Sequence, residues 1–170
     1  MGDPAQGRHR TLRCRTVSSG ALQHLSYVRN LPPLRVEERV GPATDGAAMT
    51  PSETLLAALG SCLAARIHAG AVTGSISVQS LELEIEVDVE KSPFWGTPGE
   101  DAKSVGFESI RVTVHFEADA PEEALRSLIS HALMWSPVAN TLHGPVHLDM
   151  TLGRTSAADG SDRAKPAFGG

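Results

Sequence analysis

The sequence is poor in the residues that mark several protein classes. It holds two cysteines in 170 residues, too few for a disulfide framework, and a chain of this length can bury a core without one. Its net charge of −5 argues against the basic face that a nucleic-acid-binding protein needs. Two tryptophans, one tyrosine and four phenylalanines give little material for stacking on single-stranded nucleic acid. The two cysteines can therefore matter only as thiols.

Long hydrophobic runs are also missing. No stretch approaches the roughly 18 uninterrupted apolar residues of a membrane span. The segment Met1–Arg10 is polar and has no apolar core of a secretory signal. With 41% hydrophobic and 21% charged residues, the composition is that of a globular chain. We expect a protein of the reducing cytoplasm that has neither a membrane nor a nucleic acid as a partner.

Both ends of the chain lack hydrophobic periodicity. Residues 1–9 and 154–170 are rich in small, polar and charged residues, which cannot bury enough surface to offset the entropy of ordering. The sequence therefore predicts a flexible N-terminus at 1–9, one folded domain at 10–153 and a disordered tail at 154–170.

Within 10–153 the hydrophobic pattern alternates between strand and helix periods. Alternation predicts three strands at 12–17, 22–28 and 34–40, two more at 81–89 and 110–116, and a last one at 146–152. A helix is predicted from Thr50 to about Val72, and a second one begins at Pro121. The order β-β-β-α-β-β-α-β predicts an α+β fold of antiparallel sheets packed on two helices.

Two segments carry clear signals for helix starts. Thr50 suits an N-cap, Pro51 suits the first helical position, and Glu53 completes a capping box. This structural role alone accounts for Glu53. Further on, Ser136 is predicted to cap a short turn at 138–142, with Pro137 at its first position.

Cys62 lies in the middle of the first predicted helix. On a helical wheel centred on Leu55, Cys62 and Arg66 share the apolar stripe one turn apart. A neighbouring cation lowers a thiol pKa and raises the fraction of nucleophilic thiolate. The alternatives are that Cys62 is an apolar filler and that Arg66 reaches solvent or a strand carboxylate. Cys14 alternates with Arg13 and Arg15 in a strand, and we interpret it as an inert core thiol.

Motifs for metals, cofactors and other nucleophiles are absent. The chain has no HExxH, CxxC, GxSxG, P-loop or dinucleotide-binding GxGxxG pattern, so we expect neither a metal nor a cofactor. The order of residues permits a Cys62–His131–Asn140 hydrolase triad, but Asn140 beside a Ser-Pro turn is commoner as a local cap.

Two segments resemble the signatures of the OsmC/Ohr superfamily. TPSETLLAALGSCL at 50–63 is similar to its central-helix signature, in which the reactive cysteine follows the helix-opening proline by eleven residues, as Cys62 follows Pro51. SPVANTL at 136–142 is similar to its second signature. The likeness covers about 20–153 and implies an intertwined homodimer with each site at the subunit interface. We assign Leu59, Trp95, Trp135 and Ser136 to its pocket, with core or dimer packing as the alternative for the two tryptophans.

The resemblance implies a thiol-dependent peroxidase. The Cys62 thiolate would displace the distal oxygen of an organic hydroperoxide, leaving a sulfenic acid and an alcohol. One arginine among Arg66, Arg39 and Arg35 would stabilise the thiolate and polarise the peroxide. Peroxidase members carry glutamate directly after the helix-opening proline, where this chain has Ser52. Glu53 occupies the neighbouring position.

One departure from the family bears on turnover. Peroxidase members begin the second signature with a resolving cysteine, and this chain has Ser136 there. The chain thus resembles a branch without that cysteine, in which an external thiol, or Cys14, must reduce the sulfenic acid in a defence against oxidative stress. Two alternatives stay open: a non-catalytic dimer that binds a small apolar ligand at its interface, and a cysteine hydrolase or acyl carrier.

Overall fold

The computed structural model describes residues 11–38, 48–89, 106–144 and 146–152. The predicted flexible ends and the predicted pocket residue Trp95 lie outside these ranges, as does Arg39. The chain divides into two compact units. One comprises Met1–Pro51 together with Met150–Gly170, and the other comprises Ser52–Asp149.

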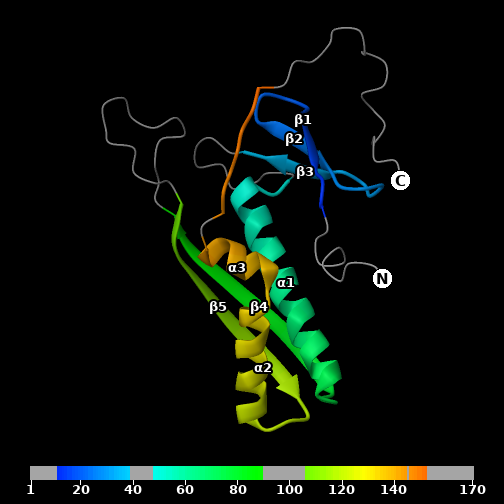
Figure 1. Cartoon of the computed structure of the whole chain (residues 1–170), viewed down its shortest axis with the longest axis vertical. Helices are drawn as coiled ribbons and strands as arrows, with labels where there is room; N and C mark the ends of the chain where they lie inside the picture. Colours follow the sequence, from blue (N-terminus) through cyan, green and yellow to red (C-terminus); the bar gives the residue numbers. More distant parts are fainter. Residues whose placement is uncertain (1–10, 39–47, 90–105, 145, 153–170) are drawn as a thin grey trace, which may run out of the picture. The chain divides into compact units, whose positions relative to one another are not determined.

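The first unit contains a three-stranded antiparallel sheet in the order β1-β2-β3 (Figure 1). Its strands are β1 (Arg15–Ser18), β2 (Gln23–Tyr27) and β3 (Leu34–Glu37), each shorter than predicted. Arg15 lies opposite Tyr27, and its guanidinium stacks on the tyrosine ring at 4.8 Å from the centroid. The three predicted N-terminal strands are therefore confirmed.

Cys14 is exposed, so the prediction of a core thiol is wrong. It precedes β1, in which Arg15 and Val17 are half-buried and Thr16 is exposed. Arg15 stacks on Tyr27 on one face of the sheet, while Cys14, one residue earlier, is open to solvent. Alternation alone did not show that the chain leaves this residue uncovered.

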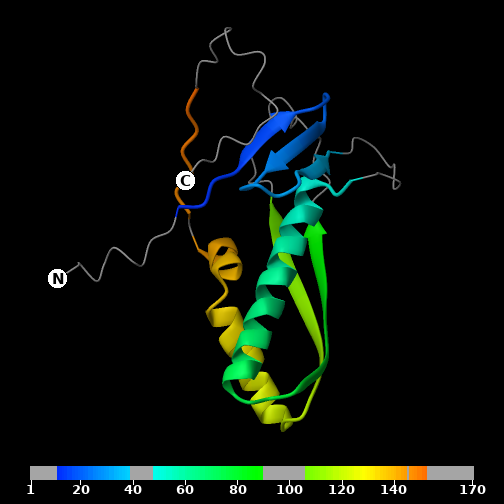
Figure 2. The same ribbon diagram turned by 90° about the vertical axis from the view of Figure 1, so that its right-hand side faces the viewer.

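The second unit is built around a helix and a hairpin. Helix α1 (Pro51–Thr73) lies along the antiparallel pair β4 (Val78–Val89) and β5 (Phe107–Ala118), as Figures 1 and 2 show. Helices α2 (Glu122–Met134) and α3 (Pro137–His143) follow beside α1. These elements confirm the predicted α+β order from the first helix to the short turn capped by Ser136.

The core of this unit forms where one edge of α1 meets the inner face of the hairpin. Buried residues recur every four positions along α1, and alternate residues of both strands pack against them. Gly70 allows the closest approach, since a Cβ there would lie 2.3 Å from Leu128 of α2. Two clusters result, with buried members Ile67, Ala71, Leu128 and Ala132 in one and Leu59, Leu63 and Ala139 in the other.

The outer face of the hairpin is charged, as its alternation predicted. Arg111 bonds to Asp88 at 2.6 Å and lies 3.6 Å from Glu86, while His115 lies 3.3 Å from Glu84. Hydrogen bonds from Arg111 and Ser109 lower the pKa of Asp88. Because all these groups are solvent-exposed, they suit solubility more than stability.

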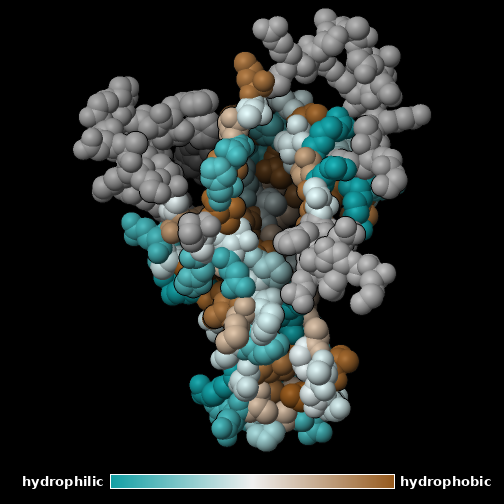
Figure 3. All heavy atoms as spheres, viewed as in Figure 1, coloured by the Kyte–Doolittle hydropathy of each residue, from teal (hydrophilic) through white to brown (hydrophobic). Residues whose placement is uncertain are grey.

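Helix α1 is apolar well beyond its buried edge. Within the described residues it is the one helix long and apolar enough to cross a membrane, although core helices of soluble proteins can be equally long and apolar. Only 22% of its most apolar stretch is buried in the single chain. Figure 3 shows apolar side chains reaching the surface over the lower parts of α1 and α2. Val72, near the end of α1, and Met134, at the end of α2, are both exposed.

Residues 146–152 do not form the predicted last strand. A strand needs a neighbouring backbone to pair with, and this segment pairs with none of the described strands. Its alternating apolar side chains are bare, with Leu148 82% and Leu152 98% exposed. The prediction of a strand is therefore wrong for the single chain.

The position of Ile67 at the centre of this core predicts a large effect on stability. Its side chain is 1% exposed, so Ile67→Ala should lower the free energy of unfolding by about 2–5 kcal/mol through lost burial and the cavity left behind. Val72→Ala on the same helix removes a side chain that is 79% exposed and should cost less than about 1 kcal/mol. Urea unfolding followed by circular dichroism measures both, and equal midpoints would contradict the packing described here.

Candidate functional site

Cys62 lies half-buried in the middle of α1. The buried edge of this helix follows Leu59, Leu63, Ile67 and Ala71, of which the first three lie on the apolar stripe that the sequence predicts. Leu55 itself is exposed at 37%. Cys62 sits at the border of the buried edge, next to the buried Leu63.

Arg66 is exposed, so its predicted place on the buried stripe is wrong. Arg66 lies about 100° around the helix from its buried neighbour Ile67. In the part of the chain that the structure describes, Arg66 makes no ion pair. It still lies one helical turn from Cys62, on the same side of α1.

Ser136 is the polar residue brought to Cys62. Helix α2 ends at Met134, and Ser136 begins α3 as its N-cap, with Pro137 at the first helical position as predicted. The Ser136 side chain is completely buried. Its Oγ accepts a hydrogen bond from the Ala139 N–H at 3.2 Å and donates one to the Cys62 Sγ at 3.1 Å.

The residues around Ser136 predict the cap but not the bond to sulfur, to which only the family resemblance points, because Ser136 occupies the position of the resolving cysteine. Ser136 and Cys62 are 74 residues apart, and their contact exists because α3 packs its Ala139 against Leu59 and Leu63 of α1. This packing brings the N-cap of α3 to the border of α1, where Cys62 lies.

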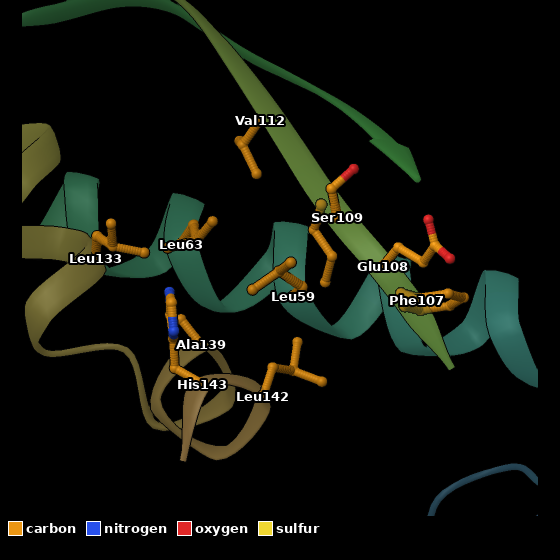
Figure 4. Close-up of a pocket in the computed structure, with 11 residues that line it drawn as sticks. Leu59, Leu63, Phe107, Glu108, Ser109, Val112, Leu133, Ala139, Leu142 and His143 are labelled. Carbon is orange, nitrogen blue, oxygen red and sulfur yellow. The ribbon is translucent and has the colours of Figure 1, made fainter. Parts of the chain in front are cut away.

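A cavity of about 430 Å³ opens between α1, β5 and α3 (Figure 4). Leu59 and Leu63 of α1 lie across it from Ala139, Leu142 and His143 of α3. Its lining is mainly apolar, and the Ser109 hydroxyl is bonded to Asp88 on the hairpin's outer face. The remaining lining residues are Phe107, Glu108, Ile110, Val112 and Leu133.

The cavity and the thiol are neighbouring but separate features. Neither Cys62 nor Ser136 lines the cavity, although Leu59 and Leu63 flank Cys62 on α1 and Ala139 bonds to Ser136. Of the residues that the sequence assigned to a pocket, Leu59 lines it. Trp135 does not: it is 60% exposed at the end of α2, where its ring lies 6.0 Å from that of His131.

The remaining candidates lie apart from the sulfur or outside this unit. Glu53 lies in the first turn of α1, where a carboxylate favours the helix N-terminus. Arg35 is exposed on β3 of the first unit. Asn140 donates to the Met134 carbonyl at 2.9 Å, the local role expected of it in place of a hydrolase triad. Among the described residues, no group of three His, Cys, Asp or Glu side chains could hold a metal ion.

Known structures share this architecture at low sequence identity. The OsmC like protein from Mycoplasma pneumoniae aligns with a TM-score of 0.66 and 17% identity over 79% of this chain and 89% of that one. An organic hydroperoxide resistance protein OsmC from Legionella pneumophila aligns with a TM-score of 0.54 and 18% identity, over 79% of this chain and 90% of that one. An OsmC-like hydroperoxide resistance protein from Jannaschia aligns with a TM-score of 0.50 and 20% identity, over 84% of this chain and 93% of that one. At these identities the matches establish the fold.

A search of curated proteins finds no match. A family model described as OsmC-like protein matches residues 44–151, which include all of α1, the hairpin, α2 and α3. This match covers more than half of the sequence and both segments that resembled family signatures. The chain therefore belongs to the OsmC-like protein family.

Proposed function

We propose that this protein is a thiol-dependent peroxidase that reduces organic hydroperoxides through Cys62. The observation that carries the proposal is the half-buried Cys62 sulfur with a hydrogen-bond donor, Ser136, directed at it. Membership of the OsmC-like family supports it, since two relatives of the same fold are described as hydroperoxide resistance proteins.

In the proposed reaction the Cys62 thiolate attacks the distal oxygen of the hydroperoxide. The sulfur–oxygen bond forms as the oxygen–oxygen bond breaks, the sulfur is oxidised to a sulfenic acid, and the alkoxide leaves as an alcohol after taking up a proton. Arg66, one turn from Cys62, is the arginine of the same unit that can stabilise the charges. Arg35 and Arg39 are the other candidates for this role. Glu53 is the candidate to orient the arginine near the thiolate.

The reductant in this proposal is an external thiol. Ser136 stands 3.1 Å from the sulfur, and its oxygen cannot form a disulfide with it. The second cysteine, Cys14, is exposed in the other unit and is the internal alternative. A pool of small thiols is maintained in a reducing cytoplasm, which is the compartment that we propose.

We also propose that the protein acts as a homodimer. Most of the apolar surface of α1 and the alternating apolar side chains of 146–152 are exposed in the single chain. Exposed apolar surface on this scale is typical of a surface that associates with another chain. An extended segment with free backbone groups can add to a sheet edge of a second copy.

The cavity supports a second candidate, a dimer that binds a small apolar ligand without turnover. Its volume of about 430 Å³ falls in the range of small-molecule sites, and its walls are mainly aliphatic. Since Cys62 does not line the cavity, a ligand bound there would not have to react with the thiol.

The peroxidase proposal predicts that activity depends on Cys62 alone. Purified protein should consume cumene hydroperoxide in the presence of dithiothreitol, and Cys62→Ser should reduce the rate to that of the buffer. Cys14→Ser is the matched control and should retain most of the activity, because the proposed reductant is the external thiol. Equal rates for the wild type and Cys62→Ser would refute the peroxidase.

The dimer predicts a sedimenting mass of twice 17.9 kDa at micromolar concentration. Leu148→Asp should shift the protein towards the single chain, since it introduces a charge on an exposed apolar side chain that we place in the dimer contact. His147→Asp introduces the same carboxylate on the opposite side of the extended segment and should have less effect. A wild-type protein that sediments as a single chain would exclude the dimer.

The ligand-binding candidate predicts a mass above that of the chain in native mass spectrometry of freshly purified protein. Leu133→Asp places a charge in the cavity wall and should remove this extra mass. Met134→Asp is the control, because Met134 is 66% exposed and does not line the cavity. A bare mass for the wild type, with no thermal stabilisation by long-chain alcohols, would count against a ligand.

A further inference from the structure

The hydrogen bonds of the Ser136 hydroxyl leave it a single direction in which to donate. A serine hydroxyl carries one proton and accepts through its lone pairs. Here the oxygen accepts from the Ala139 N–H, and its proton is directed to the Cys62 sulfur. With no exposed surface on Ser136, water does not compete for either bond.

The turn that carries Ser136 is held in place by further bonds. The Asn140 side chain donates to the Met134 carbonyl at 2.9 Å, and the Asn140 N–H donates to the Ser136 carbonyl at 3.0 Å. Pro137 fixes the backbone at the first position of α3. The Ser136 oxygen therefore cannot move away from Cys62 without losing the bond that caps α3.

A donor directed at sulfur favours the anionic form of the sulfur over the neutral thiol. The backbone N–H that bonds to Ser136 strengthens this effect, because a hydroxyl that accepts a hydrogen bond becomes a better donor. We propose that Ser136 is a positioning residue for Cys62, which holds its sulfur in place and stabilises it whenever it carries negative charge.

This role rests on the proposed function and applies at two steps of the peroxidase cycle. Before oxidation, Ser136 stabilises the attacking thiolate. After oxidation, a first external thiol condenses with the sulfenic acid to give a mixed disulfide and water. A second thiolate then attacks the external sulfur, and Cys62 leaves as a thiolate while the two external thiols are joined as a disulfide. The Ser136 proton is directed at this leaving sulfur as well.

The first test needs no peroxide and measures alkylation of Cys62 by iodoacetamide from pH 6 to pH 10, in a Cys14→Ser background. Ser136→Gly removes the hydroxyl but leaves a residue that is tolerated at an N-cap. Near pH 7, Ser136→Gly should be alkylated roughly threefold more slowly than the background protein, because less of its Cys62 is thiolate. At pH 10 it should be alkylated no more slowly, because the thiol is then ionised in both proteins and the less stabilised thiolate is the better nucleophile.

Two further variants separate the sulfur bond from the stability of the turn. Ser136→Thr keeps the hydroxyl and should restore the pH profile of the background protein. Asn140→Ala removes the side-chain bond to Met134 without touching Ser136 and should leave that profile unchanged. An unaltered profile in Ser136→Gly, or the same change in Asn140→Ala, would overturn the positioning role.

The second test follows Cys62 through the cycle by intact mass spectrometry in the same background. After one equivalent of cumene hydroperoxide and then excess 2-mercaptoethanol, the mixed disulfide should accumulate more in Ser136→Gly, since its cleavage loses the stabilised leaving group. Equal accumulation would overturn this second step. If Cys62 is not oxidised at all, the peroxidase fails, and the alkylation profile still decides the role of Ser136.

Discussion

The packing of one edge of α1 organises the whole second unit. The edge formed by Leu59, Leu63, Ile67 and Ala71 is covered by the inner face of the hairpin on one side and by α2 and α3 on the other. A hairpin alone is barely stable in water, and a helix gains most of its stability from tertiary contacts. Each element therefore depends on the burial of the same four side chains.

This packing also creates the site. Because Ala139 of α3 packs against Leu59 and Leu63, the N-cap of α3 lies beside Cys62. The same helix forms one wall of the apolar cavity through Ala139, Leu142 and His143. A seven-residue helix thus connects the hydrogen bond on the sulfur with the shape of the cavity, although neither Cys62 nor Ser136 lines that cavity.

Local patterns in the sequence predicted most elements, and errors arose where burial decided the outcome. The start of α1 at Pro51 and the cap at Ser136 depend on neighbouring residues, and both were correct. Cys14 and Arg66 were placed on inward faces, and both are exposed. Alternation and helical spacing define which residues share a face, but only the packing partners determine which face turns inward.

The segment 146–152 is an error of another kind. Its alternation of apolar and polar residues is typical of a strand, yet a strand forms only where a second backbone satisfies its hydrogen bonds. In the described part of the single chain, this segment pairs with none of the strands. The exposed Leu148 and Leu152 are consistent with a pattern that a second copy of the chain would complete.

The sequence by itself determined the order of the elements from β1 to α3, the helix starts, the family resemblance and the choice of Cys62 as the thiol of interest. These depend on residues close together in the chain, where propensity and capping act. The tertiary structure decided that Ser136 is the residue bonded to Cys62, that Arg66 points to solvent and that an apolar cavity lies beside them. Those facts depend on contacts between residues as many as 74 positions apart, which exist only after burial has folded α3 against α1.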